Sequence, residues 1–94
     1  MPNSKNVVEI DFRNEKFKVN ALAFKSMKVQ KDLALMEKNP GNAFEALDIV
    51  LCGDLDGVLM RIPEENGEVA EYGASDEAFT AFLEALALQL SAKN

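Results

Sequence analysis

The sequence predicts a mainly helical α+β domain, with an N-terminal β-hairpin followed by about four α-helices in a small helical bundle. Three observations predict this class. Residues 7–20 alternate apolar and polar side chains, as half-buried strands do. Residues 26–92 instead repeat apolar side chains at helical spacing, apart from an acidic loop at 63–74. The length of 94 residues suits one small core, so we expect 1–94 to form a single domain.

The hairpin is predicted from two apolar runs separated by a polar break. A turn at Asn14-Glu15 brings apolar side chains together on one face and opposite charges on the other, and such agreement predicts a register. The predicted pairs are Phe12 with Phe17, Ile10 with Val19, and Asp11 with Lys18. Because the turn has no glycine, a longer loop remains an alternative. Two strands are marginal alone, so their apolar face must lie on the helices.

The segment from Ser26 to about Lys38 is the first predicted helix, with Ser26 as its N-cap. Its core stripe consists of Val29, Leu33 and Met36. Lys28 and Asp32 form an i,i+4 pair on the solvent side. The run Asn39-Pro40-Gly41 then ends the helix, because proline restricts the residue before it and cannot donate an amide.

The second predicted helix begins at Asn42, which forms a near capping box with Glu45. Its apolar residues leave only Glu45 and Asp48 as a polar strip, so we expect it to be buried on most sides. Cys52, at its end, is expected to be a small core residue. Gly53 suits the left-handed position past a helix end.

A third, short helix is predicted after Gly53, with Asp54 as its cap and Pro63 at its end. Its apolar positions recur at i, i+3, i+4 and i+7, namely Leu55, Val58, Leu59 and Ile62. The same stretch, Asp54-Leu55-Asp56-Gly57-Val58-Leu59, resembles the nucleophile loop of haloacid-dehalogenase-like phosphatases. That resemblance implies a nucleophile at the end of a parallel strand and further strands after it. The 35 residues that follow Leu59 leave no room for them, so we favour the helix and expect no enzyme.

Residues 63–74 are acidic, contain Gly67 and Gly73, and predict a solvated loop. Val69 and Tyr72 within it are candidates for a short strand or a partner contact. The last predicted helix begins at Ser75. Its core stripe consists of Phe79, Phe82, Leu83, Leu86 and Leu90, and a second, weaker apolar face consists of Ala78, Ala81, Ala85 and Leu88. The candidate partner-binding residues are Met27, Ala81, Ala85 and Leu88.

Composition argues against several classes of function. The chain has no histidine and a single cysteine, so we predict no catalytic residues, no cofactor and no metal site. The net charge of −6 argues against a nucleic-acid partner. The first residues do not read as a secretory signal, and no apolar run reaches the ~20 residues of a membrane span, so we expect a cytoplasmic protein. Residues 1–38 have a net charge of +3 and residues 39–94 of −9, which permits self-association.

Taken together, the pattern resembles the small tail assembly chaperones of long-tailed bacteriophages and prophages. The segments that carry the resemblance are Phe17-Lys18-Val19, the run Asn39 to Asp48, the break at Gly53, the acidic loop, and the run Ala78 to Leu86. It implies a helical binding protein that keeps the tape-measure protein soluble and competent for tail assembly, with the tail tube protein as a second candidate partner. The alternative is a structural tail or head-tail connector, which would form closed rings.

Overall fold

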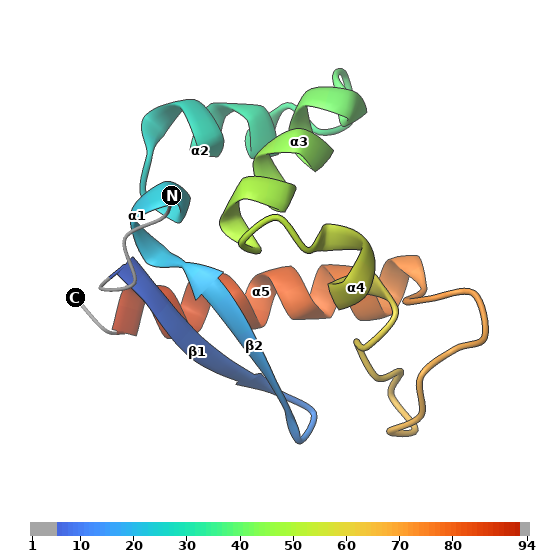
Figure 1. Ribbon diagram of the computed structural model, residues 1–94. Coiled ribbons are helices and arrows are strands. Elements are labelled where there is room, and N and C mark those ends of the chain that lie inside the picture. Colours follow the sequence, from blue (N-terminus) through green and yellow to red (C-terminus); the bar gives the residue numbers. More distant parts are fainter. Residues whose placement is uncertain (1–5, 93–94) are drawn as a thin grey trace. The chain divides into compact units, whose positions relative to one another are not determined.

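The computed structural model describes residues 6–92, which form a two-stranded antiparallel sheet followed by five helices (Figure 1). This confirms the predicted α+β class with its N-terminal hairpin. The described chain divides into two compact units. The first unit contains residues 6–8 and Lys18–Leu55. The second contains Glu9–Phe17 and residues 56–92. The expectation of a single domain stays a prediction.

The hairpin consists of β1 (Val7–Phe12) and β2 (Glu15–Asn20), and its turn is formed by Arg13 and Asn14. Both turn residues have positive φ, 50° and 68°, as in the two-residue turns whose twist matches that of paired strands. The predicted turn at Asn14-Glu15 was therefore wrong by one residue. Asn tolerates the left-handed region better than most residues, so the turn forms without glycine.

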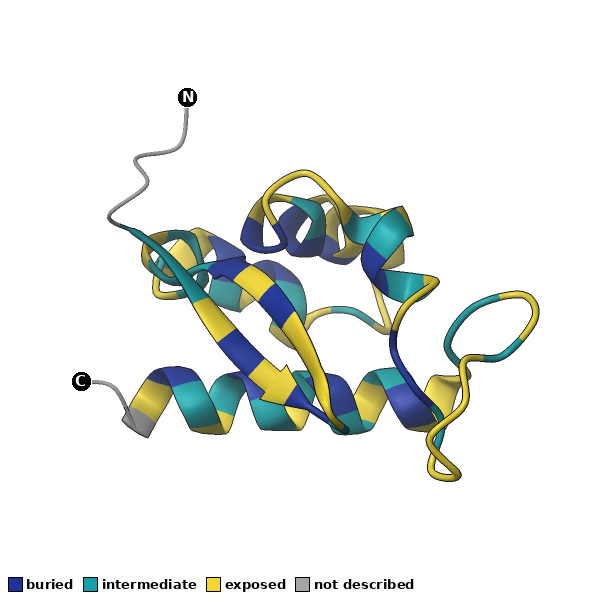
Figure 2. Cartoon of the chain, turned by 60° about the horizontal axis from the view of Figure 1, so that its bottom comes forward, coloured by how far each residue is buried: buried dark blue, intermediate teal, exposed yellow. Residues whose placement is uncertain are grey.

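This correction shifts the strand pairing by two residues. Asp11 forms its ion pair with Lys16, at 2.9 Å, instead of with Lys18. A shift of two keeps every side chain on its predicted face, because the side-chain period of a strand is two. Figure 2 shows the resulting alternation, in which the buried residues are Ile10, Phe12, Phe17 and Val19.

The first unit contains a helix that the sequence did not predict. Helix α1 (Ala21–Phe24) follows β2 directly, and the Asn20 side chain accepts the Ala23 N–H at 3.0 Å. Helix α2 (Met27–Ala34) begins after Ser26 as predicted, but the Ser26 side chain makes no capping bond. The helix ends at Ala34, not near Lys38, and residues 35–38 form turns.

Helix α3 (Pro40–Val50) packs against α2 and begins two residues earlier than predicted. Proline is well suited to the first helical position, so Pro40 starts the helix and Asn42 does not cap it. Its buried face consists of Ala43, Ala46, Leu47 and Val50. The expectation of burial on most sides was wrong, because Phe44 and Ile49 are 41% and 56% exposed.

A tight bend follows α3. Cys52 and Gly53 both have positive φ, and the Gly53 N–H donates to the Asp48 carbonyl at 2.7 Å. The Asp48 carboxylate accepts the Leu55 N–H at 3.0 Å, so Asp48 takes the capping role predicted for Asp54. Helix α4 (Leu55–Leu59) is shorter than predicted. Cys52 is exposed, not a core residue, because the left-handed bend turns it out of the α3 stripe.

In the second unit, the strand residues on either side of the hairpin turn pack on helix α5 (Asp76–Ala92). The predicted start at Ser75 is confirmed, since the Ser75 hydroxyl accepts the Ala78 N–H at 3.1 Å. The Phe82 ring meets Phe12 and Phe17 edge-on, with centroids 5.7 and 5.0 Å away. The buried residues of α5 are Ala78, Phe82, Leu86 and Leu90, so Ala78 belongs to the core and not to the second face.

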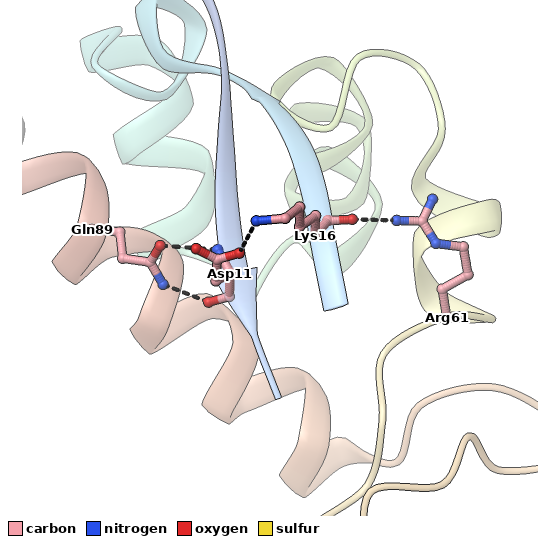
Figure 3. A network of polar contacts seen from close by, with 4 residues as sticks. All are labelled: Asp11, Lys16, Arg61 and Gln89. Atoms are coloured by element: carbon pink, nitrogen blue, oxygen red, sulfur yellow. Dashed lines mark hydrogen bonds and ion pairs between the residues drawn. The ribbon is translucent and has the colours of Figure 1, made fainter. Parts of the chain in front are cut away.

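Two long side chains complete the second unit by bonding to the hairpin backbone (Figure 3). The Arg61 guanidinium donates to the Lys16 carbonyl at 2.8 Å and lies 4.8 Å from the Phe17 ring centroid. The Gln89 carboxamide bonds to the backbone of Asp11. Along residues 6–92 no helix has the length and apolar character needed to cross a membrane.

Candidate functional site

The two aspartates of the phosphatase-like stretch lie at the start of α4. Asp54 directly precedes this helix and Asp56 is in its first turn, and both are exposed. The chain reaches Asp54 through the bend after α3, and β1 and β2 are the only strands among residues 6–92. A phosphatase nucleophile needs the carboxyl end of a parallel strand. The described fold provides no such strand at Asp54.

The described residues include one thiol, Cys52, and no cluster of metal-ligating side chains. Between residues 6 and 92, no group of three or more His, Cys, Asp or Glu side chains could hold a metal ion. Desolvation raises the pKa of the Cys52 thiol, although the positive charge of Lys18 opposes the shift. A raised pKa keeps the thiol protonated at neutral pH, which makes it a poor nucleophile.

A groove of about 350 Å³ lies in the first unit. It is lined by one face of α3 and by residues of α1 and α2. The lining residues are Ala23, Ser26, Lys28, Val29, Asp32, Asn42, Glu45, Ala46 and Ile49. The four from α3 recur at i, i+3, i+4 and i+7, so they form one continuous wall. Ile49 is half-exposed on this wall and is the largest apolar contribution to it from α3.

The polar side of the groove is held by an ion pair. Lys28 Nζ lies 2.8 Å from the carboxylate of Asp32, whose side chain is only 8% exposed, so the expectation that Asp32 faces solvent was wrong. The hydrogen bond and then the charge of Asp32 raise the pKa of Lys28, and the charge of Glu45 adds to the shift. Lys28 therefore stays charged, and Asp32, Glu45 and Lys28 together give the groove an excess of negative charge.

The predicted partner-binding residues divide between the two units. Ala81 and Ala85 are half-buried on α5, and Leu88 beside them is 72% exposed. Met27 lies in the first unit, at the start of α2, and is 79% exposed. The structure thus places Ala81, Ala85 and Leu88 on one helix. Ile49 was missed because an apolar side chain on a nearly all-apolar helix was taken for a core residue.

The acidic loop at 63–74 is closed at its base by Glu64. Its carboxylate accepts the Ser75 hydroxyl and amide at 2.6 and 2.8 Å, and these bonds lower the pKa of Glu64. The Ala74 N–H also donates to the Leu59 carbonyl at 2.8 Å. The loop therefore has a fixed base, while its tip presents Val69 and Tyr72, which are 44% and 90% exposed. As predicted, no helix or strand forms within it.

A polar depression of about 280 Å³ lies beside the base of this loop, with Arg13, Glu64, Glu65 and Glu77 in its lining. The Arg13 guanidinium donates to the Pro63 carbonyl at 2.9 Å and lies 4.7 Å from the Phe12 ring centroid. Arg13 is thus engaged in holding the loop to the hairpin turn. We assign the depression a structural role.

The candidate site therefore consists of exposed apolar side chains on helices and of the groove beside α3. Comparison with known proteins gives no match to any family model, curated protein or solved structure.

Proposed function

We propose that this protein is a tail assembly chaperone of a long-tailed phage or prophage, acting without catalysis in the cytoplasm of the bacterial host. In this role it binds the long, helical tape-measure protein and keeps it soluble until the tail tube polymerises around it. The tail tube protein is a second candidate partner. The proposal rests on the sequence resemblance and on one structural observation, the groove of the first unit with Ile49 on its wall.

The groove supports the proposal because it suits an amphipathic helix. A long helix with an uncovered apolar stripe aggregates, and a groove that accepts this stripe keeps it in solution. Ile49 is the exposed apolar contact on this wall, while Val29 and Ala46 line the groove but are almost wholly buried. The exposed Glu45 favours a partner with a basic residue beside its apolar stripe, as opposite charges across an interface improve its specificity, whereas Asp32 is already paired with Lys28.

The second face of α5 supports the same role. Leu88 is exposed, and the small side chains of Ala81 and Ala85 allow another helix to approach closely. Exposed leucines are common singly, so Leu88 alone carries little weight. Its position one turn from Ala85 extends the apolar contact along the helix.

The test is co-expression with the tape-measure protein of the same phage or prophage. We expect the chaperone to raise the soluble fraction of the tape-measure protein and to co-purify with it. Ile49→Asp should weaken capture at least about tenfold if Ile49 is a central contact. Leu88→Glu should weaken it as well, with little change in folding, because both side chains are exposed in the free protein.

Thr80→Glu is the matched control, because Thr80 is exposed on α5 outside the candidate face. It should leave capture unchanged. No gain in solubility and no co-purification would contradict the proposal. A stable closed ring that the protein forms alone and keeps in high salt, measured by light scattering, would favour the connector instead. Unfolding of Leu88→Glu would place Leu88 in the interior.

A further inference from the structure

Helix α2 has an exposed face that combines positive charge with apolar side chains. Met27, Lys31 and Ala34 follow one another at i, i+4 and i+7, so they lie on the same side of the helix, and Leu35 continues it. All four are exposed, with Met27 at 79%. These four residues are called the α2 face below. Residues 25–34 contain three lysines and one aspartate, so their net charge is +2.

The tip of the 63–74 loop has the complementary character. Tyr72 is 90% exposed and Val69 is 44% exposed at the tip of a loop whose base is fixed by hydrogen bonds. Glu68 and Glu71 alternate with them and are also exposed. The loop contains four glutamates and no basic residue, a net charge of −4.

We propose that the α2 face binds the loop tip of a second copy of this chain. Tyr72 would cover Met27, while Glu71 faces Lys31 one helical turn further along. Tyrosine is a favoured anchor for such a contact, since it buries a large area at a small cost in side-chain entropy. The opposite net charges of the α2 segment and the loop favour a second copy as the binding partner. A second copy supplies both the acidic loop and the basic face.

The contact differs from the tape-measure contact in its partner, and it assigns Met27, one of the candidate partner-binding residues, to the contact between copies. It uses neither the Ile49 wall of the groove nor Leu88. Each copy carries one loop and one α2 face, so two copies can bind reciprocally or several can bind head to tail. A contact of one loop with one helix face is smaller than a standard interface, so we expect weak, salt-sensitive association.

The test is sedimentation equilibrium of the whole protein from about 10 µM to about 1 mM, where small interfaces associate. We expect the average mass to rise with concentration and the rise to diminish in high salt. Lys31→Glu and Glu71→Lys should each weaken association at least about tenfold, because each places like charges across the contact. Tyr72→Ser should weaken it without any change in charge.

Mixing the two charge-reversed variants gives the decisive result. In the mixture, the loop that carries Glu71→Lys meets the α2 face that carries Lys31→Glu on the other variant, so opposite charges again lie across the contact. The unchanged loop and the unchanged face also meet. Association should therefore return to the level of the unmodified protein. The double variant Lys31→Glu/Glu71→Lys should also associate on its own.

Glu15→Lys and Lys18→Glu are matched controls, since they change the net charge equally at exposed strand positions outside both surfaces. They should not affect association. Circular dichroism checks that every variant is folded. A monomer at all concentrations would overturn the proposal. Association that is unchanged by Lys31→Glu and Glu71→Lys would also overturn it. So would a mixture of these two variants that does not regain association.

Discussion

The Gln89 carboxamide bonds to both backbone groups of Asp11, accepting its N–H at 3.0 Å and donating to its carbonyl at 2.7 Å. In a hairpin with a two-residue turn, the residues next to the turn are hydrogen-bonded to each other, and the following pair, Asp11 and Lys16, is not. The backbone groups of Asp11 therefore point away from β2. Gln89 satisfies them as a neighbouring strand would.

A side chain also bonds to the backbone at the other edge of the hairpin. The carbonyl of Lys16 points away from β1 and accepts the Arg61 guanidinium. An unpaired strand edge is a template for pairing with other chains, and native proteins commonly cover or block it. Here a side chain occupies each edge at the Asp11–Lys16 pair (Figure 3). The hairpin thereby joins α5 on one side and the segment after α4 on the other.

We predict that Gln89→Ala destabilises the protein by about 1–2 kcal/mol, because two hydrogen bonds are lost and water can replace them in part. Urea denaturation measures the change in the free energy of unfolding. Thr80→Ala, at an exposed position of the same helix, should change it by less than about 0.5 kcal/mol. Equal effects at the two positions would show that the Gln89 bonds do not contribute to stability.

The bonds from Ser75 to Glu64 predict a pH dependence. They lower the pKa of Glu64 below its ordinary value of 4.5, so the folded protein favours the ionised carboxylate. This stabilisation is complete above the unfolded pKa and is lost as the pH falls through the folded pKa. We expect the thermal midpoint to fall in acid, and Glu64→Gln to remove part of this fall.

The control for this prediction is Glu65→Gln. Glu65 is the exposed neighbour of Glu64, so its substitution removes the same charge while both Ser75 bonds remain. Its acid profile should follow that of the unmodified protein. If Glu64→Gln and Glu65→Gln behave alike between about pH 6 and pH 3, the Ser75 bonds are not the cause of the lowered pKa.

Sequence patterns predicted the features that depend on neighbouring residues. Alternation gave the faces of the hairpin, and the Ser75 cap gave the start of α5, because both need only local spacing. The register failed because the turn has no glycine to mark its centre. The exposure of Ile49 depends on what packs against α3, and the exposure of Cys52 depends on the left-handed bend after it; periodicity contains no information about either. Gln89 and Asp11 are 78 positions apart, and nothing local relates them.

The left-handed conformation of Asn14 gives a third prediction. Its φ of 68° disfavours residues with a Cβ, although asparagine is among the more tolerant. Asn14→Ala should destabilise the protein by about 1 kcal/mol, whereas Asn14→Gly should be at least as stable as the unmodified protein. Thermal denaturation measures both. If Asn14→Ala stabilised the protein, the two-residue turn would be contradicted and the alternative of a longer loop would be favoured.

The last prediction concerns Phe82, which is fully buried and meets the rings of both Phe12 and Phe17. Phe82→Ala should destabilise the protein by about 3–5 kcal/mol, because it leaves a cavity and removes both ring contacts. Leu88→Ala, on the same helix at a 72% exposed position, should cost less than about 0.5 kcal/mol. Urea denaturation of the two variants compares a core position with a surface position in one helix. If the two costs were similar, the hairpin would not pack on α5 through Phe82, and the apolar face of the strands would need another cover.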